Sequence, residues 1–288
     1  MIPTRARGLV SSLAALPLCL PAAGAAAPPA RHAKVSLVAE TDAVRPGQPL
    51  WVGIRLQMED GWHTYWRNPG DSGLPTRVKW DLPEAFAAGE LKWPYPTRFR
   101  TGPLVSYGYE REVLLPAEIR VPPSLPAHEV RIAARVDWLE CQEACLPGRA
   151  DVSLALPVRS TSAPGPHAVL FAEARRRLPK RDPAWQFSVS PAPSALRLVV
   201  RVPRGTALHE AYFYPSAPRL LDYGKPQTLA REGAIHRLDL PRDPNGASAE
   251  RLAGVLVAET GSGTAAVEVD APIATGPART STIQERKP

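Results

Sequence analysis

Apolar and polar residues alternate along most of this chain. In its first half the alternation has a period of two, which places successive side chains on opposite faces of a strand and lets one face be buried. The segments that show it are 35–39, 50–56, 113–121, 130–138 and 152–158. Because turns rich in Pro and Gly separate them, with no helical pattern between, we predict an antiparallel β-sandwich.

A second set of alternating segments begins at Trp185 and continues to Val269. Between the two sets, residues 167–178 carry apolar side chains at roughly helical spacing and three consecutive arginines. This pattern predicts a linker with a short helix whose basic face is solvated, followed by a second, smaller sandwich. The fold class is therefore all-β, with two antiparallel sandwiches joined by a short helical linker.

The N-terminus has the pattern of an export signal. Arg5 and Arg7 precede an apolar run from Leu9 to Leu20, and small residues follow up to Ala27. This is the charged, apolar and cleavable pattern of a secretory signal peptide, and the run is too short to span about 30 Å of hydrocarbon. We expect a soluble product in the bacterial periplasm.

These patterns divide the chain into five expected parts. They are a signal peptide (1–27), a first sandwich with the cysteine pair (33–160), a linker with a short helix (161–183), a second sandwich (184–274) and a polar tail expected to be disordered (275–288). About 260 residues after the signal peptide are enough for two domains with their own cores.

Charge does not point to nucleic acid. The formal charge of +7 falls to +5 without Arg5 and Arg7, and the remaining basic residues are spread along the chain. No basic cluster with interleaved aromatic residues is present, so we exclude a nucleic-acid partner.

Two cysteines carry the candidate chemistry. Of the three in the chain, Cys19 lies in the signal peptide, which leaves Cys141 and Cys145 with three residues between them. An even count in an exported protein favours a disulfide. A bridge that closes about five residues contributes only roughly 2 kcal/mol, whereas an exposed short bond is easily reduced. We therefore favour a redox-active pair over a structural one. The inward-facing apolar set ends at Trp138, which predicts that the thiols lie at the sandwich rim, within reach of another protein.

Two aromatic, turn-rich segments, 61–75 and 93–109, have two possible interpretations. In one, their rings fill the core and cover sheet edges. In the other, Tyr107, Tyr109 and the loop from Asn68 to Asp71 form a lid over the dithiol. The sequence leaves both open.

Four motifs occur together in this chain. They are Trp62-His63-Thr64-Tyr65-Trp66, Gly70-Asp71-Ser72-Gly73-Leu74-Pro75, Tyr107-Gly108-Tyr109, and Trp138-Leu139 followed by Cys141, Cys145 and Pro147. Over residues 33–158 the chain resembles the amino-terminal periplasmic domain of the DsbD/ScsB family of thiol:disulfide interchange proteins, and residues 184–273 resemble the second periplasmic domain of ScsB-type members. The resemblance implies immunoglobulin-like sandwiches and a cysteine pair that relays electrons without a cofactor or metal.

The resemblance also implies roles for individual residues. Cys145 matches the attacking thiol and Cys141 the resolving thiol. From the residues themselves, Glu140 and Glu143 would disfavour a thiolate by like-charge repulsion. The candidates for a lid or for support behind the sulfurs are Asn68, Asp71, Tyr107, Tyr109, Trp138, Glu140 and Glu143.

Full-length family members continue into a membrane domain and a thioredoxin-like domain, which this sequence does not contain. We therefore expect a separate membrane-embedded thiol reductase as electron donor, and periplasmic thioredoxin-like or disulfide isomerase proteins as acceptors. Two other functions stay open. One is a Cu(I)-handling module that uses both thiolates, with His63 or Met58, although neither residue lies beside the pair. The other is a non-catalytic interaction module with a structural disulfide.

Overall fold

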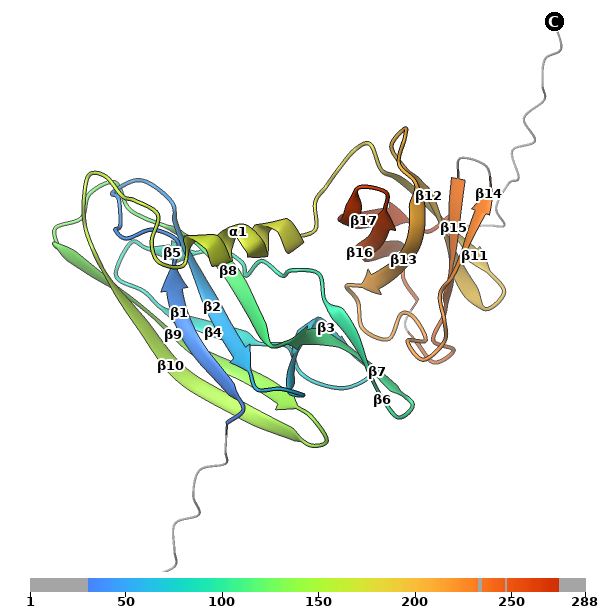
Figure 1. Ribbon diagram of the computed structural model, residues 1–288, viewed down its shortest axis with the longest axis horizontal. Coiled ribbons are helices and arrows are strands. Elements are labelled where there is room, and N and C mark those ends of the chain that lie inside the picture. The colour runs from blue at the N-terminus through green and yellow to red at the C-terminus, as the bar shows by residue number, and fades with distance from the viewer. Residues whose placement is uncertain (1–30, 233–234, 247, 275–288) are drawn as a thin grey trace, which may run out of the picture. The chain divides into compact units, whose positions relative to one another are not determined.

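The computed structural model describes residues 31–232, 235–246 and 248–274, which form antiparallel β-sheets and a single helix (Figure 1). This confirms the predicted all-β fold class. The predicted signal peptide and polar tail lie outside the described residues. Within the described ranges, no helix has the length and apolarity needed to cross a bilayer.

Two sheets are formed by residues 33–157. The four-stranded sheet has the order β1 (Ala33–Ala39), β2 (Leu50–Met58), β8 (Glu112–Arg120), β5 (Ala87–Ala88). The six-stranded sheet has the order β10 (Cys145–Pro157), β9 (Glu129–Cys141), β3 (His63–Gly70), β7 (Leu104–Glu110), β6 (Thr97–Thr101), and β4 (Arg77–Asp81) also pairs with β9.

The predicted alternation produces the core between these two sheets. Ile54 of β2 lies opposite Leu115 of β8, and both are fully buried. Ile132 and Val136 of β9 are equally buried and belong to the same apolar cluster. Polar side chains such as Arg55 of β2, Glu118 of β8 and Arg131 of β9 lie on the opposite face, as period two permits.

Residues 186–272 form the other two sheets. One has the order β11 (Gln186–Ala192), β12 (Ala195–Arg201), β15 (Ile235–Pro241), β14 (Thr228–Glu232), and the other has the order β13 (Leu208–Pro215), β16 (Arg251–Thr260), β17 (Gly263–Pro272). Among the described residues, each named strand pairs only within 33–157 or within 186–272. The assignment of these segments to two domains stays a prediction.

Helix α1 (Ala168–Arg177) packs against the first sheet and is not a free linker. Phe171 is fully buried and clusters with Leu114 of β8. Of the arginines on the predicted solvated basic face, Arg176 is exposed, whereas Arg175 donates to both carboxylate oxygens of Glu40. The three arginines of the last turn also lie at the negative end of the helix dipole, where cations are favourable.

Candidate functional site

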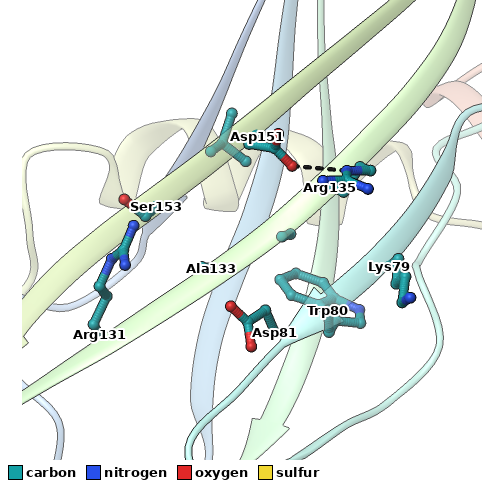
Figure 2. Close-up of a pocket in the computed structure, with 10 residues that line it drawn as sticks. Lys79, Trp80, Asp81, Arg131, Ala133, Arg135, Asp151 and Ser153 are labelled. Carbon is teal, nitrogen blue, oxygen red and sulfur yellow. Dashed lines mark hydrogen bonds and ion pairs between the residues drawn. The ribbon is translucent and has the colours of Figure 1, made fainter.

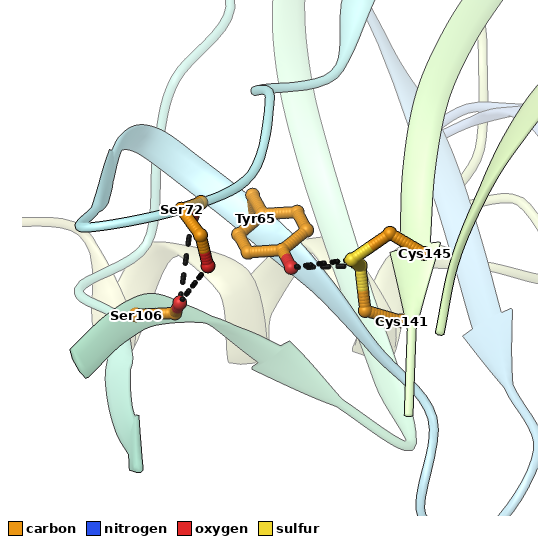
Figure 3. The surroundings of a disulfide bond; sticks show 5 residues. All are labelled: Tyr65, Ser72, Ser106, Cys141 and Cys145. Atoms are coloured by element: carbon orange, nitrogen blue, oxygen red, sulfur yellow. Dashed lines mark hydrogen bonds between the residues drawn. A yellow bond between two sulfur atoms is a disulfide. The ribbon is translucent and has the colours of Figure 1, made fainter. Parts of the chain in front are cut away.

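The two cysteines close the long hairpin of the six-stranded sheet. Cys141 is the last residue of β9 and Cys145 is the first of β10, and the two are paired in register. Their sulfurs form a disulfide (Figure 3). Cys141 is 2 % exposed, whereas Cys145 is an exposed residue. A second protein can therefore reach the pair from the Cys145 side.

A buried tyrosine contacts both sulfurs. The Tyr65 hydroxyl donates a hydrogen bond to Cys141 Sγ at 2.7 Å and lies 3.5 Å from Cys145 Sγ (Figure 3). The register explains the contact, because His63 of β3 lies opposite Cys141, and Tyr65, two residues further on, points to the same face. The sequence analysis included Tyr65 in a motif and did not identify it as a site residue.

The loop after β3 holds this ring in place. Gly73 has a φ of +107°, and a Cβ built on it would lie 2.2 Å from the Tyr65 ring. Only glycine permits both this backbone angle and this close approach. Burial raises the pKa of Tyr65, with a partial offset from its hydrogen bond to Ser72, so the phenol keeps its proton at neutral pH.

A histidine lies on the other side of the tyrosine. His63 is 8 % exposed, stacks on Phe99 with ring centroids 4.7 Å apart, and meets Tyr65 edge-on at 5.2 Å. Burial lowers the pKa of His63, and the nearby Glu110 carboxylate offsets part of that effect. The group opposite Cys141 is therefore a neutral imidazole at neutral pH.

Glu140 supports the hairpin from behind. Its side chain is 1 % exposed and accepts hydrogen bonds from His32 N, Ala33 N and Trp138 Nε1, each at 2.8 Å. The carboxylate therefore ties the start of β1 to β9 directly before Cys141, and three N–H donors face its charge. Of the two acidic residues expected to oppose a thiolate, only Glu143 is exposed, in the hairpin turn.

Trp138 completes this support. It is 5 % exposed, and a Cβ on Gly148, its partner on β10, would lie 2.1 Å from the indole ring. The absence of a side chain on Gly148 therefore makes room for the indole, whose N–H then reaches Glu140.

Two of the predicted lid residues contact the β13 side of the molecule. Asn68 Nδ2 donates to Pro215 O at 2.8 Å, and the Tyr107 hydroxyl lies 3.0 Å from that of Tyr212. Burial raises the pKa of Tyr107 far above its ordinary range, and the neighbouring tyrosines raise it further. The Tyr107 hydroxyl therefore keeps its proton at neutral pH.

The other two predicted lid residues fix local backbone. The Tyr109 hydroxyl donates to Pro94 O at 2.7 Å, and Asp71 Oδ2 accepts a hydrogen bond from Val105 N at 2.8 Å. In the described part of the chain, none of these hydrogen bonds of the four predicted lid residues reaches either sulfur. The side chain that the structure brings to the sulfurs is Tyr65 instead.

A hollow of about 430 Å³ on the outer face of β4, β9 and β10 has Ala133 on its floor and the Arg135–Asp151 ion pair at its rim (Figure 2). Neither cysteine lines it.

The described residues contain no group of three or more His, Cys, Asp or Glu side chains that could hold a metal ion. The Met58 sulfur instead accepts a long contact of 3.8 Å from Thr64 Oγ1.

Comparison with known families bears on the same segment. A family model described as "Thiol:disulfide interchange protein DsbD, N-terminal" matches residues 34–157. This match supports a DsbD N-terminal domain over these residues. The DsbD-type domain of this chain thus contains the whole β9–β10 hairpin with its disulfide and the Tyr65 strand. This match and the cysteine pair support a thiol:disulfide interchange module.

Solved structures give a fold comparison for the DsbD-type domain and the sheets that follow. The N-terminal periplasmic domain of ScsB from Proteus mirabilis is similar with a TM-score of 0.62 at 20 % identity, covering 88 % of this chain and 97 % of that one. Spo0M from Bacillus subtilis has a TM-score of only 0.23 at 11 % identity, covering 84 % of this chain and 91 % of that one, and carries no argument. No curated protein sequence matches the chain.

Proposed function

We propose that this chain is a periplasmic dithiol module that accepts electrons from a separate membrane-embedded thiol reductase and passes them to disulfide-carrying periplasmic proteins of the thioredoxin-like or isomerase type. The observation that carries the proposal is the disulfide at the hairpin end, with Cys145 exposed and Cys141 2 % exposed. The export pattern of the sequence and the match to the DsbD N-terminal family support the compartment and the class of partner.

The exposure difference gives each cysteine a role in loading the module. A thiolate of the donor attacks the Cys145 sulfur, the bond between the two cysteines breaks, and the electron pair goes to the Cys141 sulfur. A second donor thiol then displaces Cys145, which leaves a disulfide in the donor and two thiols in this chain.

Delivery runs through the same two sulfurs. The Cys145 thiolate attacks the disulfide of an acceptor and forms a mixed disulfide. Cys141 then attacks the Cys145 sulfur, which releases the reduced acceptor and restores the original bond. The exposed residue thus makes the contact with other proteins, and the buried one resolves it.

Trapping the mixed disulfide tests the proposal. Cys141→Ser keeps the exposed thiol and removes the resolving one, so we expect it to accumulate covalent complexes with periplasmic thioredoxin-like proteins. Cys145→Ser is the matched control, because its remaining thiol is buried. Capture by Cys145→Ser alone would reverse the two roles.

The reduction potential provides a second, independent test. Equilibration with glutathione should give a potential in the range of exchange proteins, well above about −300 mV. A lower value, together with no capture by either variant, would identify a structural bond and refute the proposed function.

A further inference from the structure

The Tyr65 hydroxyl is placed unequally between the two sulfurs. It lies 2.7 Å from Cys141 Sγ and 3.5 Å from Cys145 Sγ, and because a disulfide sulfur carries no proton, the hydroxyl is the donor in the shorter contact. The favoured sulfur is the one that receives the electron pair when Cys145 is attacked. We propose that Tyr65 is a catalytic residue that stabilises the Cys141 thiolate as leaving group, an inference that rests on the proposed function.

Burial makes such a donor necessary. Cys141 and Tyr65 are each 2 % exposed, so water contributes little to solvating a thiolate that forms there. An unsolvated anion in an apolar surrounding is costly, whereas an O–H donor to an ionised acceptor forms one of the stronger hydrogen bonds in proteins.

The charged groups around Cys141 leave this task to the phenol. His63, opposite Cys141 on β3, is held neutral at neutral pH because burial lowers its pKa. Glu140, the preceding residue on β9, is anionic but already accepts three N–H donors. Glu143 in the hairpin turn is exposed and carries charge of the same sign as a thiolate. None of the three therefore places a positive charge beside the sulfur.

The ring is also held in place before the reaction starts. Gly73 lies against its face and the His63 ring meets it edge-on at 5.2 Å. A donor that does not have to reorient stabilises developing charge without a reorganisation cost. In the step itself, an attacking thiolate forms a new bond to Cys145 Sγ and the electron pair of the broken bond goes to Cys141 Sγ. Tyr65 keeps its proton throughout.

Tyr65→Phe tests the inference, because it removes the hydroxyl and keeps the ring. We expect reduction of the oxidised full chain by dithiothreitol to slow about tenfold, the loss of one hydrogen bond to a charged group. In a Cys145→Ser background, the pH dependence of alkylation should show the Cys141 thiol pKa rising by about one unit on the same substitution. Tyr109→Phe is the matched control, since its buried hydroxyl donates to Pro94 O and should leave the rate unchanged.

A role as a simple shield predicts the opposite sign, because loss of the hydroxyl would open the sulfurs and speed reduction. An unchanged or faster rate with an unchanged thiol pKa would overturn the inference. The inference depends on the ratio of the reduction rates of Tyr65→Phe and wild type. It can therefore fail while mixed-disulfide capture by Cys141→Ser still supports the proposed function. A measurement without any Tyr65 variant guards against misfolding. In reduced wild-type protein, the ¹³Cζ signal of Tyr65 should titrate with the Cys141 thiol, and a signal that does not move would refute the hydrogen bond.

Discussion

Replacing Glu140 by Ala should destabilise the chain more than any other substitution of an acidic residue in the dithiol hairpin. The carboxylate is 1 % exposed and accepts three N–H donors at 2.8 Å, two of them from residues of the β1 start and one from Trp138 Nε1. Two of these hydrogen bonds, from Ala33 N and Trp138 Nε1, are buried, so their donors cannot turn to water instead.

The magnitude follows from those two donors. A buried donor left without an acceptor costs about 2 kcal/mol, so Glu140→Ala should lower the free energy of unfolding by about 4 kcal/mol. For a chain of this size that corresponds to a fall in Tm of about 10 °C. Glu140→Gln keeps one amide oxygen as acceptor but directs an NH₂ group at another donor, so we expect a loss of about 2 kcal/mol.

Urea unfolding followed by tryptophan fluorescence provides the assay, with the disulfide kept oxidised in every sample. Glu143→Ala is the matched control, since it removes an exposed carboxylate three residues away and should change the free energy of unfolding by less than about 0.5 kcal/mol. If Glu140→Ala unfolded at the same urea concentration as Glu143→Ala, the carboxylate would not be an anchor and the reasoning would be refuted.

Three further outcomes follow from single side chains. Burial lowers the pKa of His63 from 6.5, so the contribution of this residue to stability should be complete above pH 6.5 and fall as the pH drops below that value. His63→Gln should remove this contribution to the dependence of unfolding free energy on pH. The control His209→Gln, at an exposed position, should retain it. Gly73→Ala should cost about 3 kcal/mol in unfolding free energy, because it combines a φ of +107° with an approach of 2.2 Å to a phenol ring. Gly102→Ala, at a φ of +58° in open space, should cost only about 1 kcal/mol. Asn68→Ala leaves a carbonyl on β13 without its donor and should cost about 2 kcal/mol in the same assay.

Each of these has an outcome that contradicts it. A pH slope equal to that of wild type in His63→Gln would mean that the histidine is not neutralised by burial. Equal costs for the two glycine variants would show that the ring contact adds nothing to the backbone strain. An Asn68→Ala variant as stable as wild type would show that the amide of Asn68 does not hold β3 against β13.

Local sequence patterns predicted several segments of the fold correctly. The alternation over 130–138 lies within β9, which runs from Glu129 to Cys141, and the helical spacing over 167–178 gives a helix over Ala168–Arg177. The disulfide between Cys141 and Cys145 is also as predicted, and it lies at the end of the β9–β10 hairpin. These are local properties, because period, turn composition and cysteine spacing are all written within a few consecutive residues.

The side chains that surround the sulfurs could not be predicted from such local patterns. Tyr65 reaches Cys141 only because β3 pairs with β9, and the two residues are 76 positions apart in the chain. The same holds for Glu140, whose backbone partners His32 and Ala33 are more than 100 positions away. From the sequence alone, a carboxylate beside a cysteine is expected to repel a thiolate. The structure shows that the Glu140 carboxylate accepts three N–H donors and anchors the hairpin to β1.

The sequence by itself thus determined the strongly alternating strands, the all-β class and the cysteine pair, since side-chain periodicity and thiol spacing act over short distances. Only the tertiary structure decided which cysteine is exposed, which hydroxyl contacts the buried sulfur and where the charge of Glu140 is directed. Those properties depend on which strands lie side by side, and strand pairing is set by burial of the whole core and not by any one segment.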